Sequence, residues 1–249
     1  MNIVVLAGGL SPERDVSLST GVKVVNALRS IGHRAILVDL FFGVDALPSP
    51  VTKAFEETGE LPARPVPAVA PDLAAIRAGR KSGFSDEIGS GVPELCQAAD
   101  LTYLALHGGC GENGSLQSFF DLCGIRYTGS SSEGCMLAMD KYISKKLLDD
   151  AGVLTPKGVL LHRGAQLEPD SLPMPCVVKP CCGGSSIGIT IVRERAQLRA
   201  ALDEAFSMEE AVLVEEYVEG RELSAGVLGG EALPLIEIVP KHGFYDYQH

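Results

Sequence analysis

One twelve-residue stretch combines a lysine with a glycine-rich turn, and this combination could bind phosphate. Residues 177–188 read V-V-K-P-C-C-G-G-S-S-I-G, and an extended pattern resumes at Ile187. Strand, glycine turn and strand predict a β-hairpin. Lys179 precedes Pro180, which favours an extended backbone before it. A lysine on such a strand is costly to bury unless it meets an anion.

The turn has the composition of a phosphate-binding loop. Gly183-Gly184-Ser185-Ser186 strings together backbone N–H groups with little side-chain bulk, so this backbone can surround phosphate oxygens. One interpretation is a nucleotide phosphate beneath a glycine-rich flap, with Lys179 reaching it. The other is a surface hairpin with a solvated lysine, which the twelve residues alone favour.

Two loops that follow predicted strands carry side chains able to bind a charged substrate. In S-P-E-R-D-V-S, two acids, including Glu13, flank an arginine between a strand and a helix. The loop after residues 101–106 begins with His107 and contains Glu112. Ligands of α/β proteins bind beyond the carboxyl ends of the strands, where a carboxylate can pair with an ammonium group. Helix capping, solvent exposure or hydrogen-bonding support would explain the same residues.

A second lysine lies in the first turn of a predicted helix. The helix begins at Met139, with Asp140 as its candidate N-cap, and ends near Gly152. Its predicted apolar face consists of Ile143, Leu147, Leu148 and Ala151. Lys141 opposes the helix dipole at this end unless an anion compensates.

The cysteines predict free thiols. Seven occur, at positions 96, 110, 123, 135, 176, 181 and 182, without a C-x-x-C pair. An odd number in apolar or turn contexts favours a reducing cytoplasm over a disulfide framework. Adjacent Cys181 and Cys182 suggest a redox or metal site, but no third ligand is near in sequence. Inert thiols are the favoured interpretation.

Composition and charge exclude several classes of protein. The 249 residues can bury a substantial core in one large or two smaller domains. A net charge of −11 argues against a general affinity for nucleic acid or anionic membranes. No signal peptide is expected, and no apolar run approaches the length of a membrane span. If the ligand is a nucleotide, nearby cationic side chains, backbone amides or metal ions would have to balance the charge of its phosphates.

The predicted elements describe an α/β protein. Apolar runs at residues 2–6 and 35–38 predict buried strands with a helix between them, and residues 101–106 predict another strand. This β-α-β order predicts a parallel, doubly wound sheet. Further predicted elements are helices at 73–78, 115–123 and 198–206 and strands at 212–214 and 233–239. Residues 42–90 are rich in proline and are expected to be irregular connections around short elements.

The order of these motifs resembles one enzyme family. S-P-E-R-D-V-S-L-S-T-G resembles the S-x-E-R-E-V-S-L-x-S-G signature of D-alanine–D-alanine ligases, and A-L-H-G-G-C-G-E-N-G-S-L-Q resembles their A-L-H-G-x-x-G-E-D-G-x-L-Q loop. Y-T-G-S, M-D-K, V-V-K-P, G-G-S-S-I-G, V-L-V-E-E-Y-V and F-Y-D-Y follow in the family's order. The resemblance runs from Asn2 to His249, apart from residues 42–90, so the chain is identified as a member of this family.

The resemblance implies an ATP-grasp ligase fold that is incomplete at the C-terminus. Its implied parts are a doubly wound α/β domain at 1–129, a central domain with the flap at 130–216, and the beginning of a C-terminal domain at 217–249. The implied reaction makes D-alanyl-D-alanine for peptidoglycan through a D-alanyl phosphate, with ATP as co-substrate and Mg²⁺ or Mn²⁺. Such transfer depends mainly on positioning and on neutralising the phosphates.

The same resemblance implies roles for individual residues. Glu13 matches the carboxylate that binds the ammonium group of the first D-alanine, with His107 beside it as support. Ser185 matches the flap serine that is linked by hydrogen bonding to this glutamate, which makes Glu13 and Ser185 the implied catalytic pair.

The implied nucleotide ligands come from four segments. They are Lys141, Lys179, Ser185, Ser186, Glu215, Glu216, Val218 and Glu222. The lysines match those that contact ATP phosphates, and the serines are those of the flap. Glu215 matches the acid that binds the adenine amine, backbone groups at Glu216 and Val218 complete that edge, and Glu222 matches the ribose-hydroxyl ligand. Taken alone, Glu215 and Glu216 would predict only a solvated strand end.

Two departures from the family pattern stand out. Cys181-Cys182 replaces a pair that is often charged, so flap closure is expected to be tuned differently. The chain ends at F-Y-D-Y-Q-H, so the family's mobile-loop lysine-tyrosine and its metal ligands are expected beyond His249. The 249-residue product is therefore expected to be inactive, and no metal ligand is assigned within it.

Alternatives to the full reaction stay open. One is a truncated, non-catalytic fragment that binds nucleotide or substrate; another is a ligase that uses D-serine or D-lactate as its second substrate. The resemblance also implies a cytoplasmic homodimer. Its implied partners are the small molecules D-alanine and ATP, without nucleic acid or a membrane span.

Overall fold

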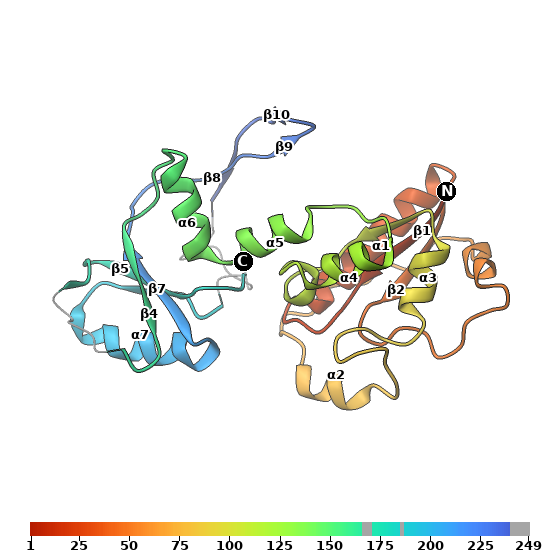
Figure 1. Ribbon diagram of the computed structural model, residues 1–249, viewed down its shortest axis with the longest axis horizontal. Coiled ribbons are helices and arrows are strands. Elements are labelled where there is room, and N and C mark those ends of the chain that lie inside the picture. The colour runs from red at the N-terminus through yellow and green to blue at the C-terminus, as the bar shows by residue number, and fades with distance from the viewer. Residues whose placement is uncertain (166–170, 185–186, 240–249) are drawn as a thin grey trace. The chain divides into compact units, whose positions relative to one another are not determined.

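The computed structural model describes residues 1–165, 171–184 and 187–239 (Figure 1). The chain divides into two compact units, Met1–Met139 and Asp140–His249. The finer division at 1–129, 130–216 and 217–249 stays a prediction. Within the described residues, none of the helices has the length and apolar character needed to cross a membrane.

The first unit is built on a three-stranded parallel sheet. Its strands are β1 (Asn2–Ala7), β2 (Arg34–Asp39) and β3 (Leu101–Leu104), in the order β2-β1-β3. Its helices are α1 (Arg14–Ser30), α2 (Leu73–Gly79), α3 (Val92–Ala98), α4 (Ser115–Cys123) and α5 (Ser132–Met139), with 3₁₀ turns η1 (Val51–Glu56) and η2 (Gly109–Gly111). Because β1 pairs in parallel with both neighbours, the predicted parallel β-α-β arrangement is confirmed.

Alternate residues of β1 face opposite sides of this sheet, and both sides are covered. Val4 and Leu6 pack in a core with side chains of η1, α3 and α4. Ile3 and Val5 pack with side chains of α1. A strand covered on both faces is apolar at every position, which is why its sequence shows a continuous apolar run.

The proline-rich region between β2 and β3 contains more structure than its sequence indicates. The helix predicted at 73–78 is present as α2, capped by Asp72, whose side chain accepts from the N–H groups of Ala74 and Ala75 at 3.0 Å. The turn η1 was not predicted, although its Phe55 is only 1% exposed and packs in the core. One aromatic anchor therefore ties this connection to the sheet.

The second unit contains a four-stranded sheet. Its strands β4 (Gly158–His162), β5 (Cys176–Pro180), β6 (Thr190–Val192) and β7 (Ala211–Glu216) lie in the order β4-β7-β5-β6, with antiparallel pairing. Its helices are α6 (Lys141–Asp150) and α7 (Arg195–Met208). The predicted β-hairpin around the glycine turn is confirmed as β5 and β6, although β6 begins only at Thr190.

One face of this sheet is apolar and the other carries charge. Val178 and Val214 pack against α7 through Leu198, Leu202 and neighbouring residues. Side chains alternate between the faces of a strand. The odd-numbered residues of β5 and β7, which include Lys179 and Glu215, therefore project from the face opposite α7.

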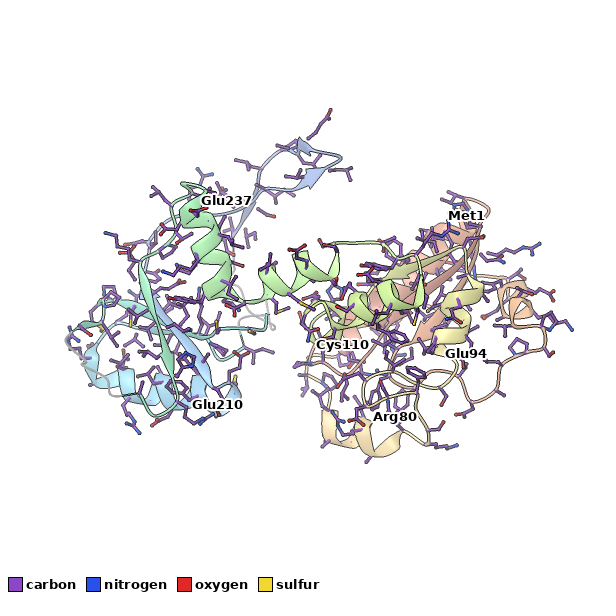
Figure 2. All side chains as sticks on the ribbon, in the orientation of Figure 1. Met1, Arg80, Glu94, Cys110, Glu210 and Glu237 are labelled. Atoms are coloured by element: carbon purple, nitrogen blue, oxygen red, sulfur yellow. The ribbon has the colours of Figure 1, made fainter. Side chains whose placement is uncertain are left out.

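Four short strands follow β7. They are β8 (Glu222–Ser224), β9 (Val227–Leu228), β10 (Glu231–Ala232) and β11 (Ile236–Ile238), paired as β8 with β11 and β9 with β10. The strand predicted at 233–239 is therefore shorter than expected. Arg221 donates to both carboxylate oxygens of Glu237, labelled in Figure 2, at 2.8 and 2.7 Å, across the β8–β11 pair.

A buried ion pair closes the turn after β1 in the first unit. Arg14, 5% exposed, donates to the carbonyl of Gly9 at 2.6 Å and pairs with Asp39. Asp39 Oδ1 also accepts from the N–H of Phe41 at 2.9 Å. Gly8 has a φ of 75°, and a Cβ there would lie 2.8 Å from Asp39 Oδ2. The arginine between the two acids is therefore a structural residue.

We predict that Arg14→Ala lowers the free energy of unfolding of the first unit by about 3–5 kcal/mol, because it leaves a largely buried carboxylate without its partner. Denaturant unfolding measures this change. The control is Arg77→Ala in the same unit, which breaks an exposed pair with Glu87 (4.0 Å) and should cost less than about 1 kcal/mol. Equal effects of the two substitutions would contradict the assignment.

Candidate functional site

In the second unit, a buried carboxylate lies between two lysines. Glu215, near the end of β7, is 6% exposed. Its Oε2 accepts a hydrogen bond from Lys145 Nζ at 2.9 Å, and its Oε1 accepts one from Lys179 Nζ. The lysine side chains are 17% and 19% exposed. Since a buried charge is costly unless it is paired, these three groups depend on one another.

Strand register explains how Lys179 reaches Glu215. In the β5–β7 ladder, Val177 is opposite Glu215, and Lys179 is opposite Leu213. Lys179 is therefore the diagonal neighbour of Glu215 on the same face, within reach of a long side chain. On the other side of β7, Gly158 is opposite Glu215, and a Cβ there would lie only 2.7 Å from the glutamate Cβ. Glycine at this position leaves room for the Glu215 Cβ and for the adjacent backbone of β7.

Helix α6 supplies the other two lysines of this region. Its start is capped as predicted, since Asp140 Oδ1 accepts from the N–H of Ile143 at 2.9 Å. Lys141 and Lys145 are four positions apart and share one face of the helix. Lys145 Nζ also donates to the carbonyl of Pro156. The predicted apolar face is exposed instead, with Leu147 at 50% exposure.

Lys141 lies next to the glycine turn. Its Nζ donates to the carbonyl of Gly183 at 2.7 Å and to that of Cys181 at 3.4 Å. Burial lowers the pKa of Lys141, and the nearby charge of Lys179 lowers it further. An anion between these two lysines would offset their repulsion.

The remaining predicted residues of this unit lie after the cluster. Glu216 Oε1 accepts from the N–H of Lys157 at 2.8 Å, while Val218 is 63% exposed. Glu222 is exposed in β8, and the hydrogen bonds found among the described residues do not join it to the cluster. Ser185 and Ser186 lie outside the described residues.

In the first unit, Glu13 and His107 come together at the ends of β1 and β3. Ser11 Oγ donates to the carbonyl of His107 at 2.7 Å, which joins the two loops. A Cβ on Gly108 would lie 2.6 Å from Glu13 Oε2, so the carboxylate lies directly against the residue after His107. His107 Nε2 is buried and finds no hydrogen-bond partner among the described residues. Such an atom normally meets water or a ligand.

Sequence reasoning missed Lys145. Its signal was its position four residues after Lys141, which predicts a shared helix face.

The second unit presents lysine cations and a carboxylate on one face of its sheet. This combination suits a ligand that has both phosphate and amine groups. The first unit offers a carboxylate next to the loop that carries the partly buried His107, an arrangement suited to an ammonium group.

Comparisons with protein families match both parts of the chain. The family model described as D-ala D-ala ligase N-terminus matches residues 2–130, and the model described as D-ala D-ala ligase C-terminus matches residues 153–249. A D-alanine–D-alanine ligase of Pediococcus pentosaceus is 42% identical over all of this chain and 72% of its own length. One from Lacticaseibacillus casei is 38% identical over 100% of this chain and 70% of its own length.

Solved structures agree with these matches. A crystal structure of D-alanine–D-alanine ligase from Bacillus anthracis has a TM-score of 0.70 and 29% identity, covering 99% of this chain and 67% of that one. A structure of the ligase from the same organism complexed with ATP has a TM-score of 0.69 and 28% identity, covering 98% and 68%.

We predict that Lys145→Met destabilises the segment around β7 by about 1.5–3 kcal/mol, because Glu215 loses one of its two charged partners. Native-state hydrogen exchange of the β5 and β7 amides measures this change. The matched control is Lys146→Met on the same helix, which removes an exposed lysine above the Tyr142 ring and should change exchange by less than about 0.5 kcal/mol. Equal protection in both variants would show that Lys145 is dispensable.

Proposed function

This chain belongs to the D-alanine–D-alanine ligase family, with its ATP-grasp fold, and from that premise we propose how its residues serve an ATP-dependent ligation of two D-alanines. A carboxylate oxygen of the first D-alanine attacks the γ-phosphorus of ATP, giving D-alanyl phosphate and ADP. The amine of the second D-alanine then attacks the acyl carbon, and phosphate leaves while the amine loses a proton. The product is D-alanyl-D-alanine for peptidoglycan.

The observation that carries the nucleotide assignment is the cluster of Lys179, Glu215 and Lys145 at one sheet face. Lys179 and Lys141 bind the phosphates, and the repulsion between these two cations supports an anion as their common ligand. Glu215 accepts from the adenine amine. Lys145 keeps the Glu215 carboxylate paired and in place when Lys179 turns to phosphate.

Glu216, the last residue of β7, and residues after it make the remaining contacts to the adenine ring and the ribose. Backbone groups at Glu216 and Val218 bind the adenine ring, and Glu222 binds the ribose hydroxyls. Ser185 and Ser186 close the flap over the phosphates. The exposure of Val218 and Glu222 supports these roles, since neither side chain is buried in the unit's own core.

The first D-alanine binds in the first unit. Glu13 receives its ammonium group, and His107 supports this contact. Two observations support the assignment: the Glu13 carboxylate lies close to Gly108, and the buried Nε2 of His107 has no hydrogen-bond partner among the described residues. The role of Ser185 that the family resemblance implies lies outside the described residues and stays a prediction.

Magnesium is implied by the family, and we test the described residues for its ligands. They contain one group of three possible metal ligands, Asp140, Cys181 and Cys182. Mg²⁺ binds oxygen ligands in octahedral geometry, so a group with two thiols does not fit it. We therefore assign no Mg²⁺ ligand among the described residues and no step to the ion. A cytoplasmic location and a homodimer belong to the proposal on family grounds alone.

We predict that Lys179→Ala weakens ATP binding by about 2–5 kcal/mol, because a charge that meets phosphate in a partly buried site is lost. Titration calorimetry with ATP measures the affinity. Lys146→Ala is the matched control and should bind ATP normally, with circular dichroism to confirm that both variants fold. Unchanged affinity of the Lys179 variant would restrict this lysine to its structural pair with Glu215.

The identity of the second substrate is tested by enzyme assay. We predict that D-alanine alone stimulates phosphate release from ATP and yields D-alanyl-D-alanine, because one amino acid serves both subsites. Adding D-serine or D-lactate should then produce little mixed product, as mass spectrometry can show. Absence of stimulation by D-alanine would make the substrate assignment wrong.

A further inference from the structure

Two thiols and a carboxylate come together beside the glycine turn. Asp140, Cys181 and Cys182 each offer a ligand atom, and these atoms lie within 4.8 Å of one another. Cys181 Sγ lies 3.3 Å from Asp140 Oδ1. In the part of the chain that the structure describes, no other group of three or more His, Cys, Asp or Glu side chains meets this criterion. A third ligand could not be recognised from the sequence, because Asp140 is 41 positions from Cys181.

Backbone contacts hold the three side chains in this arrangement. The chain bends at Cys181 and Cys182, directly after β5, so two adjacent side chains need not point to opposite faces as they would within a strand. The N–H of Lys141 donates to the carbonyl of Cys181 at 3.0 Å, which joins the start of α6 to this bend. The N–H of Cys182 donates to the Glu209 carboxylate at 2.9 Å. The donors are thus supported by α6, β5 and the segment after α7.

The donor set suits a soft divalent cation. Thiolate sulfur with one carboxylate oxygen favours Zn²⁺ or Cd²⁺ over Mg²⁺ or Ca²⁺. With Zn–S bonds of about 2.3 Å and Zn–O bonds of about 2.0–2.2 Å, ligand atoms of a tetrahedral site are roughly 3.5–3.8 Å apart. Small side-chain rotations would bring the three atoms from their observed spacing to this one.

A disulfide explains the pair less well. Consecutive Cα atoms are about 3.8 Å apart, whereas disulfides usually need about 4.4–6.8 Å. Both cysteines are free in the structure. A metal, in contrast, can bind both sulfurs without joining them to each other.

We propose that Asp140, Cys181 and Cys182 form a binding site for a thiophilic divalent cation, with Zn²⁺ as the ion, and with a fourth position for water. Asp140 can supply Oδ2 while Oδ1 continues to cap α6. The ion would fasten the start of α6 to the bend after β5, the two segments that carry Lys141 and Lys179. The site is independent of the proposed ligation, because its test measures metal binding alone.

The thiols of Cys181 and Cys182 must lose their protons before they can bind a metal ion. Burial raises the pKa of Cys181 to about 11, and burial also raises the pKa of Cys182, with Glu209 and Asp140 adding to the effect and Lys141 opposing it. Both thiols therefore carry protons at neutral pH when no metal is bound. Zn²⁺ must displace them, so uptake releases protons into solution.

The test is metal titration of the 249-residue chain after reduction and removal of bound metals. We expect one equivalent of Zn²⁺ to bind in competition with a chromophoric chelator, and Cd²⁺ to produce a thiolate-to-metal charge-transfer band. Cys182→Ser should weaken Zn²⁺ binding by at least about 100-fold, and Asp140→Asn by about tenfold or more, since both remove direct ligands.

The controls separate this site from the other thiols. Cys135→Ser removes a partly buried thiol of the first unit and should leave Zn²⁺ affinity and the Cd²⁺ band unchanged. Circular dichroism confirms that each variant folds, and Cys182 is suited to substitution because it is only partly buried. No stoichiometric binding, or equal Zn²⁺ affinity in Cys182→Ser and the unsubstituted chain, would overturn the proposal.

Discussion

A carboxylate buried in the second unit must be paired, and Glu215 meets this constraint with two lysines. Lys179 reaches it from the neighbouring strand and Lys145 from α6, so one charge joins the sheet and the helix. Removing either lysine leaves Glu215 with one charged partner instead of two, and leaves one of its carboxylate oxygens without that hydrogen bond. The same groups suit the proposed nucleotide. Lys179 would bind its phosphates, while Lys145 continues to pair with the Glu215 carboxylate. Stability and binding therefore depend on one cluster.

In the first unit, two adjacent residues have separate roles, one in stability and one in proposed substrate binding. Arg14 is committed to Asp39 and the turn after β1, whereas its neighbour Glu13 lies against the loop that carries His107. The motif that resembles the family signature therefore contains both a structural cation and a candidate substrate ligand. Sequence alone could not divide these roles, because adjacent polar residues at a helix start look alike.

Much of the architecture could be predicted where the local pattern is strong. The continuous apolar run at residues 2–6 predicted a strand covered on both faces, and the hairpin around the glycine turn was predicted from its flanking strands. Short elements such as η1, α3 and α5 were missed, since few residues give a weak periodic signal. The predicted apolar face of α6 is exposed, because periodicity shows that apolar residues share a face and not what that face packs against.

The amino-acid sequence by itself determined the family, the parallel order of the first sheet, and the candidate roles of Lys179 and Glu13, because these follow from ordered motifs and local patterns. The tertiary structure alone decided which charges meet. Glu215 is 36 positions from Lys179 and 70 from Lys145, and Cys181 is 41 from Asp140. Contacts over such separations depend on strand register and on how a helix end meets a strand end, which no local pattern contains.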